Sequence, residues 1–325
     1  MSGPLRGWGP ILLLIAQRIA QGVLLLFAVS VLIFVGTEIL PGDVASSILG
    51  QAATPQALEN LRRELGLDQP AIVRYFSWLG GVLTGDLGVA LSNRRDIATA
   101  IAPRLSNTLF LAFWAAAVSV PLAILLGLIA VRYRNGVVDK TISGLALAST
   151  SLPEFFVGYV LIFIFAVTLN WFPSFSTVYE GMPFWQRMQA IALPAAALTL
   201  VVLAHMMRMT RAAILNVMQS AYIETAELKG MSQFDIIRRH AFPNAIAPIA
   251  NVVMLNLAFL VVGVVVIEVI FVYPGMGQYL VDHVSKRDVP VVQAVGLIFA
   301  AVYIGLNLLA DIAAILANPR LRHPR

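Results

Sequence analysis

A group of charged side chains lies between two strongly apolar runs, in the stretch from Tyr222 to Pro248. This stretch reads YIETAELKGMSQFDIIRRHAFPNAIAP. Its charged residues are of both signs: Glu224, Glu227, Lys229, Asp235, Arg238 and Arg239. Mixed charge beside apolar residues suits recognition of another protein, because charge sets specificity while apolar contacts supply affinity. The stretch therefore predicts a contact surface for a soluble protein.

Two short helices are expected to present these side chains. Residues 222–229 are compatible with a helix, and Gly230 should end it because glycine adopts the sharp turn that a compact projection needs. Ser232 is a candidate N-cap for a second helix over 233–242, with Pro243 at its end. Ala226 is expected to leave room for close approach. Met231, Phe234 and Ile237 are expected to be buried.

Motifs for catalysis, nucleotide binding or metal binding are absent from the sequence. There is no G-x-x-x-x-G-K-[ST] loop for ATP phosphates and no H-E-x-x-H zinc motif. There is no cysteine, which excludes disulfides, thiolate metal sites and cysteine nucleophiles. Gly275–Gly277 lacks the third glycine of a dinucleotide fingerprint and is expected only to turn the chain. We therefore expect no catalytic residue, no metal site and no cofactor in this chain.

Composition places these residues in an integral membrane protein. Of the 325 residues 59% are hydrophobic and only 12% are charged, whereas soluble domains carry about 25% charged residues. Several apolar runs exceed the ~18 residues that mark a membrane-spanning helix. The uncharged run 19–37 is longer than the ~7–15 residues of a signal-peptide core, so we expect a retained anchor. The net charge of +5 fits basic cytoplasmic loops better than nucleic-acid binding.

Hydropathy predicts an all-α protein with six transmembrane helices. The expected spans are 19–40, 108–131, 141–169, 191–207, 245–270 and 289–310, the third being kinked or broken at Pro153 and Glu154. The corresponding divisions are an N-terminus (1–18), the first helix (19–40), an outer loop (41–107), a five-helix core (108–317) containing the charged loop 212–244, and a tail (318–325).

Basic residues predict the orientation. The outer loop 41–107 is too long for the positive-inside rule to apply. Among the shorter loops, most lysines and arginines fall on the side of the two termini, and only Arg187, Lys286 and Arg287 fall on the other. We therefore expect both termini and the charged stretch after Tyr222 to be cytoplasmic.

The outer loop is expected to contain an amphipathic helix in ATPQALENLRRELGLDQP. Thr54 is a candidate N-cap, Pro55 suits the first helical position, and Gly66 is a C-terminal stop. Leu58, Leu61 and Leu65 form one apolar stripe. The helix either rests on the membrane surface or offers a docking platform to an extracytoplasmic partner.

Ionisable and amide groups near the membrane are candidates for a transport pathway by default. The ionisable ones are Glu38, Glu154, His205, Arg208, Glu268 and Asp311. Placement near span ends explains Glu38, Arg208 and Asp311 as interfacial residues. The residues considered for an outer gate or pathway are Glu268, Pro274, Gly275, Asn251 and Asn256, with helix packing as the alternative. We expect Met206, Met207 and Met209 to pack in the protein rather than to bind a soft metal.

The sequence resembles a known family at several independent places. Glu224, Ala226, Gly230 and Pro243 match the spacing E-x-A-x(3)-G-x(12)-P, which resembles the EAA loop of permease subunits in bacterial ATP-binding-cassette importers. The longer string TAELKGMSQFDIIRRHAFPNAIAP is similar to the oligopeptide/dipeptide permease branch. Further matching strings are ILPGDVA, LGLDQPAIVRYFSWL, GDLGVAL, IEVIFVYPGMGQYLVDHVSKRDVPVVQ and NPRLR. The resemblance runs from the first span to the C-terminus.

The resemblance implies a type I importer permease in the bacterial inner membrane that carries di- or oligopeptides, or nickel, glutathione, oligosaccharides or opine-like solutes. It implies a coupling loop made of Glu224, Thr225, Ala226, Glu227, Lys229, Gly230, Met231, Phe234, His240 and Pro243. The implied partners are a second homologous permease subunit, two ATPase subunits that bind ATP and Mg²⁺, an extracytoplasmic solute-binding protein and membrane lipid, with no nucleic acid.

This sequence departs from the family pattern within the coupling loop. Thr225 replaces the second alanine of the EAA triplet, which is a small change. Glu224 and Glu227 stand where the peptide branch often has arginines. These acids are expected to affect which ATPase the loop accepts rather than whether it couples.

Two other classes of protein would each require sequence features of their own. A gradient-driven secondary transporter would show inverted repeats and paired acids at the membrane midplane, but we find no convincing repeat and the acids lie near span ends. An intramembrane hydrolase would need a serine beside His205 and donors for an oxyanion. The sequence identifies neither.

Overall fold

The structure is a computed structural model that describes residues 9–39, 46, 54–64 and 66–317. Within these ranges the chain is helical, and its only β-type contact is an isolated bridge between Val89 and Asp96. The α-helices are α1 (Gly9–Ile39), α3 (Pro55–Glu64), α4 (Ala71–Thr84), α5 (Ile97–Arg132), α6 (Val137–Ser151), α7 (Glu154–Leu161), α8 (Phe184–Met218), α9 (Ala221–Leu228), α10 (Gln233–Ile236), α11 (Phe242–Ile270), α12 (Met276–Ser285) and α13 (Val289–Ala317). Two π-helical segments are η3 (Ile162–Thr168) and η4 (Ile237–Ala241).

In the described residues, five helices are long and apolar enough to cross a membrane, and a bent pair makes up to six. The bent pair consists of α6 and the α7–η3 segment, which meet at 104°. The break falls at Leu152 and Pro153, where the sequence predicts it, because proline disfavours a helical residue before it. The all-α fold is therefore confirmed.

The membrane helices extend beyond the apolar runs that predict them. The second begins at Ile97, eleven residues before its expected start at residue 108. Asp96 fixes this start, because its carboxyl group accepts a hydrogen bond from the Thr99 amide at 2.8 Å. Hydropathy detects the lipid-compatible part of such a helix, whereas its ends depend on capping.

The central core lies between α5, α8 and α11. Leu111, Ile191, Leu198, Met206 and Met207 are at most 2% exposed within one apolar cluster. Met206 and Met207 thus pack in the core as expected, whereas Met209 is 44% exposed. Gly127 of α5 lies where α8 approaches closely. A Cβ at Gly127 would lie 2.9 Å from Thr210 Cγ2.

Helix α1 lies along α13, and polar contacts join the two near both ends. Arg18 pairs with Asp311 at 3.3 Å. Gln293 donates a hydrogen bond to Thr37 Oγ1 at 2.7 Å. Helix α4 is also joined to α1, because Arg74 of α4 pairs with Glu38 of α1 at 2.6 Å. Glu38 and Asp311 therefore serve as ion-pair partners between helices.

The outer-loop helix forms as the sequence predicts at its two ends. Thr54 Oγ1 accepts a hydrogen bond from the Ala57 amide at 3.2 Å, and Gly66 adopts a φ of +66° just after α3. Leu65 lies outside the described residues, and nothing is described of the Leu61 side chain, so the apolar stripe remains a prediction. Residues 40–45 of ILPGDVA and all of NPRLR also lie outside the described residues.

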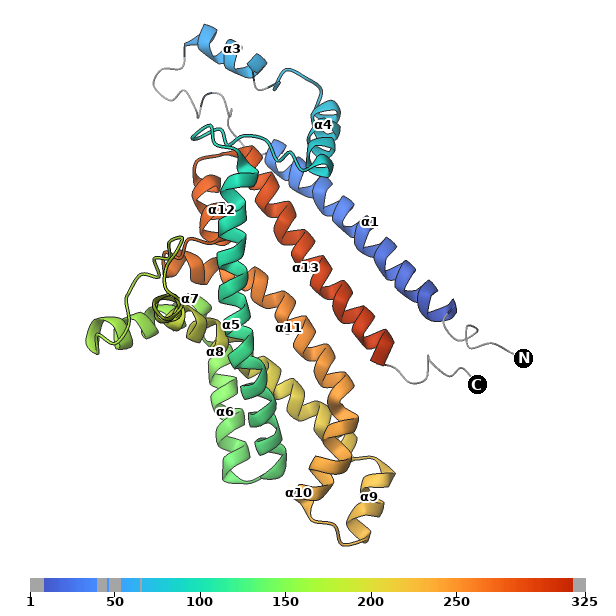
Figure 1. The fold of residues 1–325 in the computed structure, drawn as a ribbon. Coiled ribbons are helices and arrows are strands. Elements are labelled where there is room, and N and C mark those ends of the chain that lie inside the picture. The colour runs from blue at the N-terminus through green and yellow to red at the C-terminus, as the bar shows by residue number, and fades with distance from the viewer. Residues whose placement is uncertain (1–8, 40–45, 47–53, 65, 318–325) are drawn as a thin grey trace.

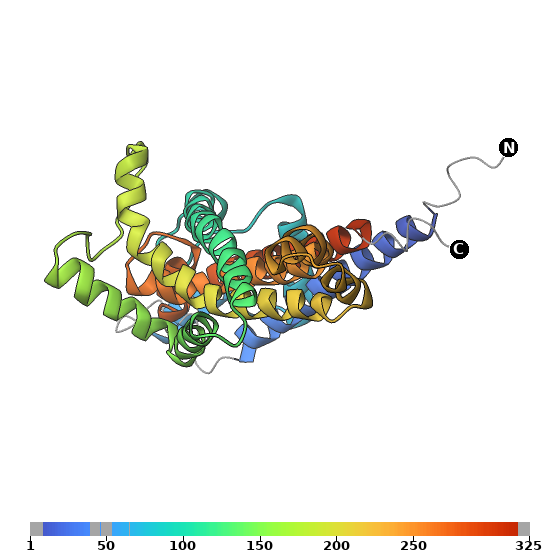
Figure 2. The same ribbon diagram turned by 90° about the horizontal axis from the view of Figure 1, so that it is seen from below.

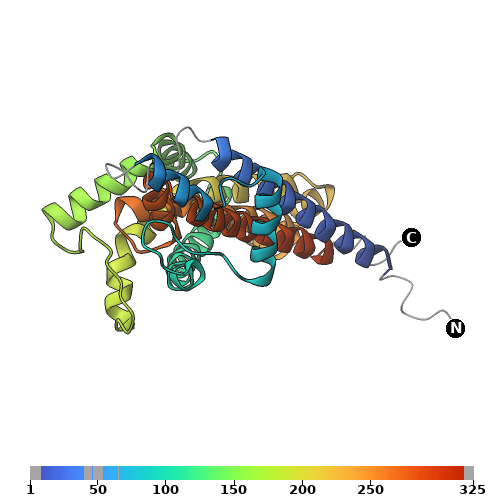
Figure 3. The same ribbon diagram turned by 90° about the horizontal axis from the view of Figure 1, so that it is seen from above.

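The two ends of the molecule differ in what they present. Helices α9 and α10 lie at one end of the bundle, whereas α3, α4 and α12 lie at the other (Figure 1). Seen along the bundle, the α7–η3 segment and the N-terminal end of α8 extend away from the remaining helices (Figures 2 and 3). The bend before α7 produces this extended arm.

An ion pair ties α6 to α8 at the end of the bundle that carries α9 and α10. Arg211 contacts both oxygens of the Asp139 carboxylate, at 2.8 Å and 2.7 Å. The Asn135 amide and the Ser143 hydroxyl also donate to this carboxylate. The Asp139 side chain is 6% exposed and that of Arg211 is 26% exposed.

Arg211→Met is expected to lower the free energy of unfolding by about 3 kcal/mol, because it leaves the Asp139 charge buried without a counter-ion. Asp139→Asn should cost less, since Arg211 retains access to solvent. Thermal unfolding of the purified variants in one detergent checks the order. A larger loss for Asp139→Asn would contradict the account of this pair.

Candidate functional site

The projection after α8 is closed by a left-handed glycine. Helix α9 ends at Leu228, and Gly230 adopts a φ of +77°. The Gly230 amide donates to the Glu227 carbonyl at 2.9 Å, and the Met231 amide donates to the Ala226 carbonyl at 3.3 Å. These bonds satisfy carbonyls that the end of a helix otherwise leaves open. Gly230 therefore ends the first helix as predicted.

The second helix begins as predicted but does not end at Pro243. Ser232 Oγ accepts a hydrogen bond from the Asp235 amide at 3.2 Å, which caps α10. Helix α10 then continues through the π-helical segment η4 directly into α11, and Pro243 lies in the first turn of α11. The prediction of a separate short helix over 233–242 is therefore wrong. A proline lacks an amide donor, and the change to π-helical bonding before it lets the chain continue.

The inner face of the projection packs on the bundle. Ile223, Ile236 and Ile237 are at most 6% exposed, in a cluster that includes Val131 and Ile214 of α5 and α8. Helix α9 is thereby fixed to the membrane helices through packed side chains. It does not hang from a flexible linker.

Of the expectations about this packing, only the burial of Phe234 is wrong. Ala226 is 7% exposed within that cluster, so its small side chain allows α9 to approach the bundle closely. Phe234 is 54% exposed, because it follows the cap of α10 on the outward side of the helix. Met231 is half-buried at the edge of the cluster, and Ile237 is buried as expected.

The outer face of the projection combines apolar and charged groups. Leu228 is 83% exposed and Tyr222 is 45% exposed. Arg238 lies 5.7 Å over the Phe234 ring, and Arg239 pairs with Asp235 at 3.5 Å. The other exposed members of the predicted loop are Glu224, Thr225, Glu227, Lys229, Gly230 and Pro243, while His240 is half-buried. We call the exposed apolar side chains Tyr222, Leu228 and Phe234 the apolar tip.

A second site of converging polar groups lies at the opposite end, around Glu268. Its side chain is 0% exposed. One carboxyl oxygen accepts a hydrogen bond from Thr108 Oγ1 at 2.6 Å. The other accepts from the Gly277 amide at 2.6 Å and the Gln278 amide at 3.2 Å. Thr108 in turn accepts from the Met276 amide at 2.8 Å. We call this the outer cluster; it holds the N-terminus of α12 against α5 and α11.

The GMG sequence is explained by the outer cluster. A Cβ at Gly275 would overlap the Glu268 carboxyl group, and a Cβ at Gly277 would lie 2.5 Å from Val265 Cα. Both positions therefore need glycine for close packing of α12 on α11. The expectation that these residues turn the chain was incomplete.

The loop between α11 and α12 is held by residues that the sequence did not single out. Asn107 donates to the Pro274 carbonyl at 2.9 Å, and its own carbonyl accepts from the Tyr273 hydroxyl at 2.8 Å. Arg187 reaches the Asn107 side chain at 3.0 Å. In the sequence, Asn107 and Thr108 are a polar pair just before an apolar run. This pattern does not indicate that Thr108 binds Glu268, 160 residues away.

The remaining pathway candidates do not gather at one place. Glu268, Pro274 and Gly275 meet at the outer cluster, whereas Asn251 is exposed on α11. Asn256 is 7% exposed and donates to the Val252 carbonyl of its own helix at 2.8 Å. Glu154 is the first residue of α7 and is half-buried.

His205 and Arg208 are exposed on α8. In the part of the chain that the structure describes, no serine hydroxyl is hydrogen-bonded to His205. A serine hydrolase centred on His205 therefore has no support from the geometry.

Comparison with known proteins identifies the family. The model described as binding-protein-dependent transport system inner membrane component matches residues 119–323, and the model for the N-terminal part of such components matches residues 11–112. This chain belongs to that family. It is a multi-pass permease component of the inner membrane and not a catalytic subunit.

Named relatives align with almost the whole permease. A Brucella abortus protein described as a peptide transport system permease is 38% identical over 312 residues, covering 95% of this chain and 99% of its own. The glutathione transport system permease protein GsiC of an Escherichia coli strain is 37% identical over 298 residues, covering 92% of this chain and 95% of its own. The family resemblance seen in the sequence is confirmed.

Proposed function

We propose that this permease forms half of the translocation pathway of an ATP-driven importer and is coupled to a cytoplasmic ATPase through residues 222–243. The observation that carries the proposal is the apolar tip, with Leu228 83% exposed at the end of a projection whose inner face is packed. Exposed apolar groups on a rigid support mark a docking site for a protein. ATP and Mg²⁺ are bound by the ATPase subunits, and both termini lie on their side of the membrane.

The charges around the apolar tip support specificity for one ATPase. Glu224, Glu227 and Lys229 are all exposed beside Leu228. Arg238 and Asp235 already contact neighbouring side chains. Charged groups at the edge of an interface steer association and exclude wrong partners more than they add affinity.

The proposed solutes are di- or oligopeptides. The names of the relatives support this choice, since one refers to peptide transport and another to glutathione, which is itself a small peptide. Nickel, oligosaccharides and opine-like compounds have no such support. A separate extracytoplasmic protein delivers the solute.

A second permease subunit completes the pathway. The extended arm supports this part of the proposal, because α7 and η3 leave the bundle (Figure 2). They also carry exposed aromatic side chains. Phe156, Tyr159 and Phe163 are 47%, 58% and 65% exposed. The arm would pack against a homologous subunit, with lipid covering what remains.

Leu228→Asp is expected to weaken binding of the ATPase subunits by about 30-fold or more, as for a central anchor of an interface. Val137→Asp is the matched control, since Val137 is 80% exposed and is the first residue of α6. The turn between α5 and α6 lies at the same end of the bundle as α9 and α10 (Figure 1). The measurement is co-purification from mild detergent, followed by titration of the ATPase. Equal recovery of the ATPase with both variants would contradict docking at the apolar tip.

Uptake by the reconstituted complex tests the energy source and the solute. In proteoliposomes, labelled di- and tripeptides should enter only when ATP, the ATPase subunits and the binding protein are present. Uptake by the permease alone, driven by a proton or sodium gradient, would instead identify a secondary transporter.

A further inference from the structure

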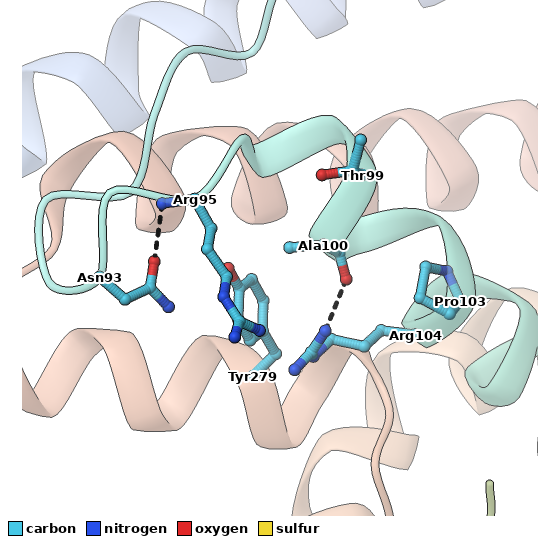
Figure 4. Close-up of a pocket in the computed structure, with 7 residues that line it drawn as sticks. All are labelled: Asn93, Arg95, Thr99, Ala100, Pro103, Arg104 and Tyr279. Carbon is cyan, nitrogen blue, oxygen red and sulfur yellow. Dashed lines mark hydrogen bonds between the residues drawn. The ribbon is translucent and has the colours of Figure 1, made fainter. Parts of the chain in front are cut away.

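A small basic pocket lies at the end of the bundle that carries α12, between the loop before α5 and the side of α12. Its volume is about 260 Å³. Asn93 and Arg95 line it from the loop, Thr99 and Arg104 from the first turns of α5, and Tyr279 from α12 (Figure 4). It is separate from the outer cluster, which neither Arg95 nor Arg104 touches.

Two guanidinium groups converge in this pocket. The side chains of Arg95 and Arg104 point toward one another across the Tyr279 ring (Figure 4). Arg104 lies 4.3 Å from the ring centroid and donates one hydrogen bond, to the Ala100 carbonyl at 2.7 Å. In the described part of the chain neither arginine forms an ion pair. Most of their donors are therefore available to a ligand.

The acidic groups nearby are already engaged by backbone amides. The Asp288 carboxylate is 1% exposed and accepts from the Leu91 and Ser92 amides at 3.0 Å and 2.9 Å. Asp96 accepts from the Thr99 amide. These carboxylates fix the loop that carries Arg95, and among the described residues neither of them forms an ion pair with Arg95 or Arg104.

Tyr279 adds a buried donor that lacks a partner. Its side chain is 5% exposed, yet its hydroxyl group makes no hydrogen bond among the described residues. The His283 ring holds the Tyr279 ring in place with a centroid distance of 4.1 Å. Burial raises the pKa of the Tyr279 hydroxyl, so the group stays protonated and can donate. A buried donor without an acceptor costs about 1–3 kcal/mol, which an incoming acceptor would recover.

We propose that this pocket binds the carboxylate of an aspartate or glutamate side chain on the extracytoplasmic binding protein, an inference that rests on the proposed function. Arginine forks match a carboxylate in shape and charge, and charge-assisted bonds of this kind are the strong ones. The pocket is smaller than the about 300–1,000 Å³ of typical small-molecule sites. It therefore suits one side chain better than a whole solute.

A carboxylate bound in the pocket would contact α12, which is the helix that the outer cluster holds. Tyr279 lies in the first turn of α12, two residues after Gly277. A carboxylate bound to Tyr279 and Arg104 therefore bridges α12 and α5, which Glu268 and Thr108 also join. Docking of the binding protein would reinforce this junction.

The test measures affinity between the purified binding protein and the complete importer complex in lipid nanodiscs. Arg95→Gln combined with Arg104→Gln is expected to weaken binding by about 100-fold, because two charge-assisted contacts are lost. Tyr279→Phe is expected to weaken binding by about 5-fold. The thermal stability of the Tyr279→Phe variant should not fall, since the Tyr279 hydroxyl makes no hydrogen bond among the described residues. Arg287→Gln, an exposed cation near the end of α12 that does not line the pocket, is the matched control and should bind normally.

A charge exchange identifies the partner residue. Arg104→Glu should abolish binding, and replacing one acidic residue on the facing surface of the binding protein with lysine should restore it. Failure of every such replacement to restore binding would overturn the proposal.

The remaining outcomes distinguish failure of the pocket proposal from failure of the proposed function. A wild-type complex that binds its binding protein, with a double variant that binds equally well, would overturn this proposal and leave the proposed function intact. A double variant with normal binding but a raised solute concentration for half-maximal uptake would also overturn it, and would assign the pocket to the solute's own carboxylate. A wild-type complex that captures no binding protein would overturn both.

Discussion

Replacing Gly230 with proline is expected to abolish ATP-driven uptake while the membrane helices stay inserted. The residue adopts a φ of +77°, whereas proline fixes φ near −65°. Its amide also donates to the Glu227 carbonyl at 2.9 Å, and proline has no amide hydrogen. The turn between α9 and α10 must therefore change path and move the apolar tip away from its docking position. Uptake of labelled peptide into proteoliposomes should fall to background.

Two variants control for this result. Gly230→Asn should retain most uptake, because asparagine tolerates the left-handed region and no atom lies within 4 Å of a Cβ at this position. Gly181→Pro makes the same change at an exposed glycine with a φ of +81°, in the loop between η3 and α8. It should leave ATPase coupling unchanged. Normal uptake by Gly230→Pro would remove the coupling role from this loop.

Glu268→Ala is expected to destabilise the protein by about 4 kcal/mol. The substitution leaves three donors buried without their acceptor, namely the Thr108 hydroxyl and the amides of Gly277 and Gln278. Each unsatisfied group costs about 1–3 kcal/mol, and a cavity adds to the loss. The midpoint of thermal unfolding in detergent measures the effect, and loss of the α12 position should also weaken binding of the binding protein.

Matched variants distinguish the outer cluster from general disruption of α11. Glu268→Gln should be milder, since the amide oxygen can still accept from the α12 amides. Asn256→Ala removes another buried polar group of α11, whose hydrogen bond goes only to its own helix, and should cost about 1 kcal/mol. If Asn256→Ala proved as damaging as Glu268→Ala, the special role of the outer cluster would be refuted.

The parts of the fold that depend on local sequence were predictable. Apolar runs located the membrane helices, Pro153 located the break before α7, and Gly230 and Ser232 located the turn between α9 and α10. Each of these depends on the residue itself or on neighbours within one helical turn. Pro243 was misjudged because the π-helical bonding before it reflects how the whole segment packs.

The candidate sites depended on contacts between distant residues and were only partly predictable. Ala226 was expected to leave room for close approach, but its sequence context does not indicate that the approaching element is the bundle. Glu268 was recognised as unusual, yet its partner Thr108 lies 160 residues away. The Arg104–Tyr279 contact likewise joins α5 to α12, and no spacing within the sequence relates the two.

The uninterrupted course of the chain from α10 into α11 has a mechanical consequence. The segment Gln233–Ile270 has 38 residues, which corresponds to a rod about 57 Å long. Tilting such a rod by about 5° around one end displaces the other by about 5 Å. Its irregular bonding and its prolines, η4, Pro243 and Pro248, all lie near the projection. Bending is therefore expected to concentrate beside the proposed ATPase contact, so that the stiff remainder would act as a lever whose far end carries Glu268.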